Sequence, residues 1–220
     1  MKKIILFYIV FINSLFAQQN SATLFNLSEY FPLNLKTKMI FNSTIGETIR
    51  TVQKADSFYV VSINTDKLKY NQTYCKKGNG IYLISTEQNV KILFFSKHAE
   101  VAYNEPALQL KQPLRIGDTW QWNGYQIKNG KDSVAVTMSG RVIANERIEV
   151  PAGKFETLKV EIIITDNDVM KTVLTQWLVK DVGAVKTQIE TKGKGILHWA
   201  LSLMGYSIIV FELEKIITLP

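Results

Sequence analysis

Apolar and polar residues alternate in short segments along most of the chain. These segments are rich in β-branched and aromatic residues and cover residues 56–64, 80–86, 90–97, 132–140, 156–165, 170–180 and 206–216. A period near two in such residue types predicts β-strands. No long helical stripe occurs in the middle of the chain. The sequence therefore predicts an all-β, predominantly antiparallel fold with at most one short helix, placed near the C-terminus.

The residues between these segments agree with this pattern. Asn129-Gly130 predicts a tight hairpin because both positions tolerate positive φ, and the polar residues 165–168 are a second turn candidate. In the segment VPAG, Pro151 fixes φ and Gly153 permits backbone angles that other residues resist. We interpret this segment as a corner that leads one strand into the next. A ligand-gripping loop is the less favoured alternative, since the corner has no polar side chain.

Two pairs of segments resemble each other and predict an internal duplication. PLNLKTKMIFN at 32–42 aligns with PLRIGDTWQWN at 113–123, and Tyr74 precedes Gly80 by the same six residues that separate Trp177 from Gly183. Such repeats imply repeated supersecondary units. The expectation is two related β-meanders, or half-barrels, packed together so that their edge strands find partners. Chance similarity between strands and turns is the alternative.

The N-terminus has the layout of a secretory signal peptide. Two lysines precede an uninterrupted apolar stretch at 4–12, and a polar shift ends in Ala17. This apolar stretch is shorter than the roughly 20 residues of a spanning helix, which disfavours an uncleaved anchor. We expect export to the periplasm or the exterior, with cleavage near Ala17. The predicted divisions are 1–17 signal peptide, 18–28 mature N-terminal segment, 29–105 first β-meander repeat, 106–112 connector and 113–220 second β-meander repeat, with one packed domain as the alternative.

Charge and chemistry-bearing residues narrow the function. The net charge of +7 falls to +5 without residues 1–17, which contain two lysines and no acid. The surplus is spread out, so no nucleic-acid partner is expected. Neither His98 nor His198 has metal-ligand spacing, and no catalytic motif or cofactor-binding motif occurs. The single Cys75 is interpreted as a small residue in or beside a strand, with a reactive thiol as the alternative.

Aromatic residues are the candidate ligand contacts. Trp120 and Trp122 are two apart and share a strand face, and Trp177 occupies the repeat position of Tyr74. These four residues form either a platform for a sugar, a lipid or an apolar peptide, or part of a filled core; the core is favoured because aromatics supply much of the burial in β proteins. A lipid or another hydrophobic molecule is the preferred small-molecule ligand. No transmembrane span is expected in the mature chain. Peripheral membrane contact through the apolar residues 195–211 is a minority interpretation.

Five ordered segments carry a family resemblance. They are EYFPLNLKTKMIF (29–41), PLRIGDTWQW (113–122), EVPAGKF (149–155), QWLVKDVGAVKTQ (176–188) and MGYSIIVFELEKI (204–216). Together they resemble the TapB-like family of exported bacterial proteins, which has a β-rich domain of unknown function. The resemblance implies an exported β protein and supplies no catalytic residues.

Three functions remain open from the sequence. The first is a noncatalytic exported envelope protein that binds a hydrophobic small molecule, a lipid or an envelope protein partner. The second is a structural or assembly factor with a filled core that recognises a partner through an exposed edge strand. The third and least favoured is a hydrolase with an unrecognised site. A dry apolar cavity would favour the first, and a polar cluster around a histidine in a cleft would favour the third.

Overall fold

The computed structural model describes residues 23–33, 36–92, 95–166, 170–193 and 208–219. The described chain forms one short helix and a series of strands. In chain order these are α1 (Leu27–Tyr30), β1 (Thr37–Ser43), β2 (Thr48–Ala55), β3 (Phe58–Asn64), β4 (Leu68–Lys77), β5 (Gly80–Ile92), β6 (Phe95–Lys111), β7 (Thr119–Lys128), β8 (Asp132–Val150), β9 (Gly153–Asp166), β10 (Met170–Val179), β11 (Gly183–Gly193) and β12 (Ile208–Thr218).

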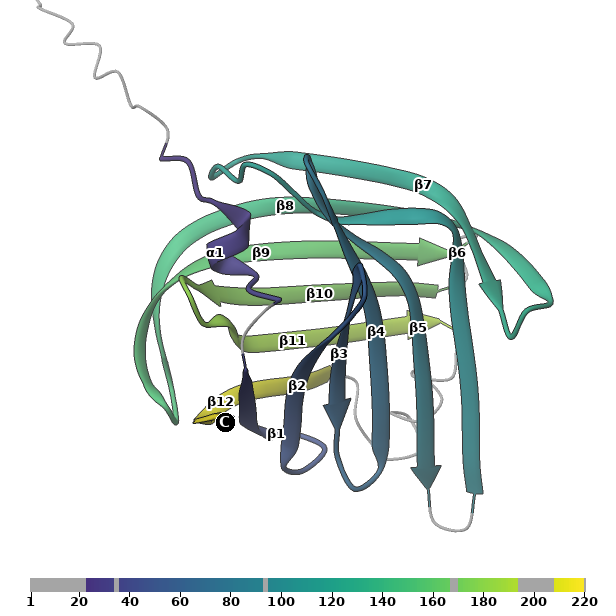
Figure 1. The fold of residues 1–220 in the computed structure, drawn as a ribbon, viewed down its shortest axis with the longest axis horizontal. Coiled ribbons are helices and arrows are strands. Elements are labelled where there is room, and N and C mark those ends of the chain that lie inside the picture. The colour runs from purple at the N-terminus through teal and green to yellow at the C-terminus, as the bar shows by residue number, and fades with distance from the viewer. Residues whose placement is uncertain (1–22, 34–35, 93–94, 167–169, 194–207, 220) are drawn as a thin grey trace, which may run out of the picture.

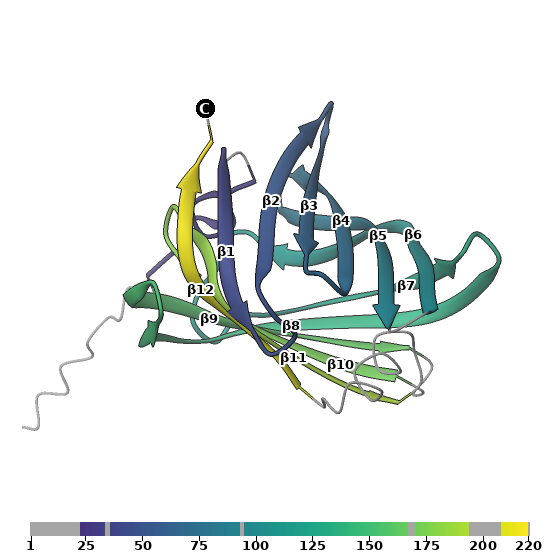
Figure 2. The ribbon, with the colours of Figure 1, turned by 90° about the horizontal axis from the view of Figure 1, so that it is seen from below.

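The strands form one closed antiparallel barrel (Figures 1 and 2). Each strand pairs with its neighbours in the chain, and β1 pairs with β12 from Thr37↔Thr218 to Ser43↔Phe211. The prediction of an all-β, antiparallel fold is confirmed. Instead of two packed half-barrel units, β1–β6 and β7–β12 are two runs of one continuous sheet. Closure removes the edges that two separate meanders would expose.

The strand boundaries correct two sequence-based expectations. The prediction of a single strand over 90–97 is wrong, because β5 ends at Ile92 and β6 begins at Phe95. Ile92 and Phe95 pair with each other, so β5 and β6 form a hairpin. Most of the expected connector at 106–112 belongs to β6, which runs to Lys111. The Asn129-Gly130 hairpin is confirmed, with φ of 50° and 66°. The helix expected near the C-terminus concerns residues outside the described ranges, and the helix observed is α1.

Helix α1 and its flanking residues pack into one end of the barrel. Asn26 caps the helix by accepting a hydrogen bond from the Ser28 amide at 3.1 Å. The Phe31 ring meets the Tyr74 ring edge-on at 5.6 Å. Glu29 anchors the helix to the β10–β11 turn through a Lys180 ion pair at 2.9 Å. The buried residues of this segment join the larger core cluster: Phe25, Leu27, Phe31 and Leu33.

The hairpin of β8 and β9 extends beyond the barrel wall. Its tip is the predicted corner, where Val150 pairs with Gly153 and Gly153 has a φ of +131°. The Ala152 amide donates to the Leu213 carbonyl of β12 at 2.9 Å. Figure 1 shows the hairpin curving towards the end of β12. The corner therefore joins β8 to β9 and links them to β12 through a backbone hydrogen bond, which agrees with the architectural interpretation of this segment.

Candidate functional site

Burial of the side chains on the inner face of the barrel differs from one end to the other. In register across the strands, inward residues near α1 are buried almost completely, as with Leu158, Val160 and Leu178. Farther from α1, inward side chains retain partial solvent accessibility although strands surround them. The partly accessible apolar set is Val52, Ile63, Val101, Ile164, Leu174 and Ile189. Four of these six side chains, Val52, Ile63, Ile164 and Leu174, pack against the larger core cluster. The inward-facing, partly accessible set is the candidate site and is called the inner lining below.

A buried polar cluster stands at the end of the barrel away from α1. Asp166 at the end of β9 accepts hydrogen bonds from Gln126 Nε2 at 3.0 Å and from Lys128 Nζ at 2.7 Å. The Asp166 side chain is 5% exposed and that of Lys128 is 34% exposed. A buried carboxylate is tolerated when an ion pair and a further hydrogen bond satisfy it. This cluster therefore stabilises the wall, and its charges already neutralise each other.

Three tyrosines project into the same interior. Burial raises the pKa of Tyr70 to about 12, despite hydrogen bonds with Thr86 and Gln72 that lower it. Burial also raises the pKa of Tyr74 and of Tyr103 above the ordinary value of 10, and the proximity of Tyr70 raises both further. Loss of water disfavours the phenolate form in each case. Tyr70 and Tyr74 are four residues apart on β4, so their side chains lie on the same face of that strand.

These raised pKa values predict a loss of stability at alkaline pH. The unfolded chain releases phenolic protons from about pH 10, while folded Tyr70 keeps its proton until about pH 12. The contribution is therefore complete below about pH 10 and disappears as the pH rises towards 12, at about 1.4 kcal/mol per pH unit for each tyrosine. Urea unfolding across this range should give a shallower decline for Tyr70→Phe than for the wild type. Equal slopes would contradict the prediction.

The predicted ligand residues Trp120 and Trp122 share the inner face, as their spacing indicates. Trp120 pairs with Gly140 on β8, where an added Cβ would overlap its indole, and Trp122 lies over Gly124 on its own strand in the same way. Trp122 also meets the Tyr103 ring edge-on at 5.6 Å. Both indole N–H groups are buried and have no acceptor among the described residues. Both residues belong to the larger core cluster, together with Tyr74.

The structure places Trp177 apart from the other three candidates. It is in register with Lys159 and Lys186, on the face opposite to buried Val160. Those lysines lie over its ring, with Nζ 5.0 Å and 5.5 Å from the centroid. Its indole N–H donates to Glu146 Oε1 at 2.6 Å. This hydrogen bond, together with the hydrogen bond and charge of Lys159, holds the pKa of the Glu146 carboxyl below its usual value. Trp177 is thus a covered residue of the outer face.

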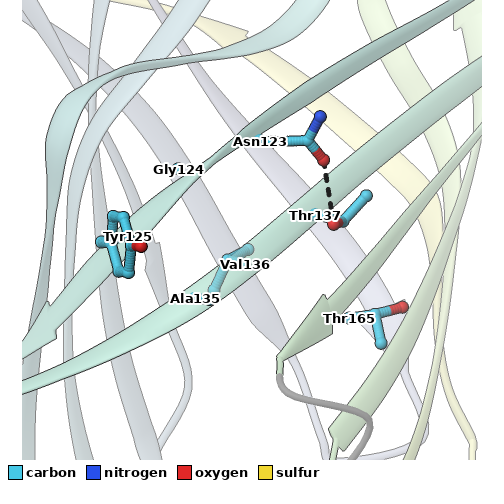
Figure 3. Close-up of a pocket in the computed structure, with 7 residues that line it drawn as sticks. All are labelled: Asn123, Gly124, Tyr125, Ala135, Val136, Thr137 and Thr165. Atoms are coloured by element: carbon cyan, nitrogen blue, oxygen red, sulfur yellow. Dashed lines mark hydrogen bonds between the residues drawn. The ribbon is translucent and has the colours of Figure 1, made fainter.

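A surface depression of about 410 Å³ lies outside the barrel over β7, β8 and β9 (Figure 3). Asn123 Oδ1 accepts hydrogen bonds there from Thr137 Oγ1 at 3.0 Å and from Gln121 Nε2 at 3.1 Å. Tyr125 stands exposed beside it. The lining of the depression has no charged residue. The side-chain oxygen of Asn123 already accepts hydrogen bonds from two donors. The depression is therefore a weaker candidate site than the interior.

His98 and Cys75 lie outside the inner lining. His98 is exposed on β6, with Nδ1 2.9 Å from Asn89 Oδ1, and His198 is outside the described residues. Cys75 is buried in β4. In the described ranges, no three His, Cys, Asp or Glu side chains are grouped to hold a metal. No helix among the described residues has the length and apolar character needed to cross a membrane.

Sequence reasoning missed Arg50, Tyr70 and Tyr103 as residues of the inner lining. Arg50 stands in TIRTVQKA, where apolar and polar residues are mixed and no face is marked as inward. Its orientation follows from its register with Met39 and Ile63, which only the assembled sheet shows. The signal available in the sequence was the spacing of Arg50 and Val52, which are two residues apart and therefore share one face of a strand.

Comparison with known proteins gives a partial match. Residues 99–197, from β6 to just beyond β11, match the family model described as DUF3108-like. No curated protein matches the chain. Among solved structures, the chain is similar to a putative lipoprotein from Parabacteroides distasonis ATCC 8503, with 12% identity, a TM-score of 0.38, and coverage of 86% of this chain and 98% of that one. The TapB-like resemblance stays a prediction; over residues 99–197 the chain is similar to DUF3108-like proteins.

Proposed function

We propose that the protein is a noncatalytic, exported binding protein whose barrel holds a hydrophobic small molecule or a lipid. The observation that carries this proposal is the set of apolar side chains that face inward and remain partly accessible. Barrels of about eight strands are just wide enough to be filled by their own side chains, and wider barrels enclose cavities. The barrel formed by β1 to β12 has more than eight strands and is therefore wider than a barrel that its own side chains just fill.

The arrangement of polar groups supports binding over catalysis. Asp166 is held by Gln126 and Lys128, which leaves its carboxylate committed to the wall. His98 is exposed outside the barrel beside Asn89 and Glu87. A general base must reach the proton that it removes, and this histidine does not face the interior of the barrel. We therefore assign the interior to binding rather than to hydrolysis.

Export is the second part of this proposal. It is supported by the signal-peptide layout of residues 1–17 and by the resemblance to exported proteins. The mature protein would begin near Gln18 and act in the periplasm or outside the cell. An extracytoplasmic carrier for an apolar molecule fits this compartment, because such molecules need shielding from water between membranes.

The test is mass spectrometry of the protein purified gently from its own cell envelope. Spectra under native conditions should show a stoichiometric mass increment, and organic extraction should release an apolar molecule of that mass. Re-addition of the extracted molecule should change the fluorescence of Trp120 and Trp122, which border the interior. A protein that is isolated empty, and that binds no component of the extract, would contradict the proposal.

An assembly factor is the second candidate function, and one observation favours it. β6 and β7 pair through only three residue pairs, from Val101↔Lys128 to Tyr103↔Gln126. Beyond Tyr103 the two strands are joined by the Asn104 side chain, whose Oδ1 accepts from the Tyr125 amide at 2.7 Å. Strand segments without a backbone partner can accept a strand from another protein. Isolation of the protein empty but with a stoichiometric partner would favour this candidate.

A further inference from the structure

Arg50 projects from β2 into the barrel without a carboxylate partner. Its register partners are Met39 on β1 and Ile63 on β3, and its Nη1 donates to the Sδ of Met39 at 3.3 Å. A thioether is a weak acceptor and brings no charge. Arg50 takes part in no ion pair with the residues that the structure describes. By contrast, the inward cation Lys128 is paired with Asp166 at 2.7 Å.

An unpaired guanidinium inside a barrel is unfavourable in the absence of a ligand. Burial lowers the pKa of Arg50, because the surrounding strands remove water that would solvate its charge. Breaking or omitting one partner of a buried ion pair is strongly destabilising. A residue with this cost is expected where an anion enters from outside. The planar guanidinium fork suits a carboxylate or a phosphate, each of which can accept two parallel hydrogen bonds.

Two tyrosines of β4, Tyr70 and Tyr74, share the inward face with Arg50. Tyr70 lies in the same row as Arg50, since each pairs in register with Ile63. Arg50 is near enough to Tyr74 for its charge to lower the pKa of that phenol, while Tyr70 and Tyr103 raise it. No hydrogen bond involves the hydroxyl of Tyr74 or Tyr103 within the described residues. The interior thus has a cation without a carboxylate partner and tyrosine hydroxyls on the same face, which together suit an acidic group.

Partly buried apolar side chains also face inward, in addition to the polar cluster around Asp166. They come from both halves of the barrel, with Val52 and Ile63 beside Arg50 and the others on β6, β9, β10 and β11. We propose that the barrel binds an amphipathic anion, whose acidic head group pairs with Arg50 and accepts hydrogen bonds from the tyrosine hydroxyls while its apolar tail lies against these apolar side chains. The inference rests on the binding function proposed above and specifies its ligand class.

Binding of three probes that share one tail tests the head group. Dodecanoate, dodecyl phosphate and 1-dodecanol are titrated into the delipidated protein by calorimetry. The wild type should bind at least one of the two anions about tenfold more tightly than the alcohol, because charge-assisted hydrogen bonds are about twice as strong as neutral ones. The relative affinities of dodecanoate and dodecyl phosphate then identify the head group as a carboxylate or a phosphate.

The variant Arg50→Met locates the anion. It should weaken the preferred anion about tenfold and leave dodecanol unchanged, whereas Arg50→Lys should keep part of the preference. Arg141→Met is the matched control, since Arg141 lies outside the barrel and pairs with Glu161 at 2.9 Å. Arg50→Met should also be no less stable than the wild type without ligand, which distinguishes a binding residue from a structural one.

The outcomes separate the two proposals. Equal wild-type affinity for all three probes would keep the binding function and overturn the anionic head group, and this comparison needs no variant. An Arg50→Met variant that retains the preference would also overturn the assignment. If the wild type binds none of the probes and is isolated without a ligand, the proposed function fails and this inference fails with it.

Discussion

Replacing Leu27 by alanine is expected to lower the free energy of unfolding by about 2–5 kcal/mol, the range for a leucine removed from a close-packed core. Leu27 is 1% exposed and belongs to the larger core cluster. Alanine is a better helix former than leucine, so the loss would come from packing and not from helix propensity. Urea unfolding monitored by tryptophan fluorescence measures the difference.

Leu24→Ala is the matched control for this prediction. Leu24 belongs to the same N-terminal segment but is 56% exposed. Its substitution should change the free energy of unfolding by no more than about 0.5 kcal/mol. Similar effects at the two positions would show that α1 does not depend on docking into the barrel end. The difference between them therefore tests whether the helix closes that end.

Gly140→Ala is expected to cost about 1–3 kcal/mol, the range for overpacking a core. The added methyl group would overlap the Trp120 indole, which lies flat across β8. The ring must then leave its place against the inner wall. Thermal unfolding measures the loss, and the near-ultraviolet circular dichroism of the tryptophans should change with it. Gly140→Ala with unchanged stability and an unchanged spectrum would contradict this packing.

Two further variants separate the contact from the general effect of losing a glycine. Gly78→Ala places a methyl group where no atom lies within 4 Å, so it should not destabilise the protein. Trp120→Ala is destabilising alone, but in combination with Gly140→Ala the two losses should not add. A coupling of about 0.5–3 kcal/mol is the range for residues in contact. Additive losses would place Trp120 away from Gly140.

Local signals in the sequence predicted the strands but not how the chain closes. The alternation around Trp120 and Trp122 placed them correctly on one face, because a strand has a fixed period of two. The turn between β5 and β6 was missed, since the run VKILFFSK contains no glycine or proline to interrupt it. The pairing of β1 with β12 joins the two ends of the described sheet, and no local pattern encodes it.

The candidate site was predicted in part. Tyr74 and Trp177 occupy matching positions in the sequence, yet Tyr74 faces inward and Trp177 faces outward. A register shift precedes Tyr74 in the β4–β5 pair but follows Trp177 in the β10–β11 pair. In both pairs the extra residue lies on the following strand, Ile84 of β5 and Val185 of β11, so the two hairpins differ in where the bulge falls relative to the aromatic residue. Sequence similarity between the two hairpins therefore does not transfer the orientation of their aromatic residues.

Closure by β12 also sets the order in which the chain can fold. β1 is complete when residue 43 is available, but its partner on one side ends at residue 218. A chain that emerges from its N-terminus during synthesis exposes the free edge of β1 until nearly all of the protein has emerged. Sheets built on such distant contacts fold slowly, and their unpaired edges are prone to aggregation. Until β12 arrives, the nascent chain exposes an unpaired strand edge, a feature that makes partly folded chains depend on chaperones.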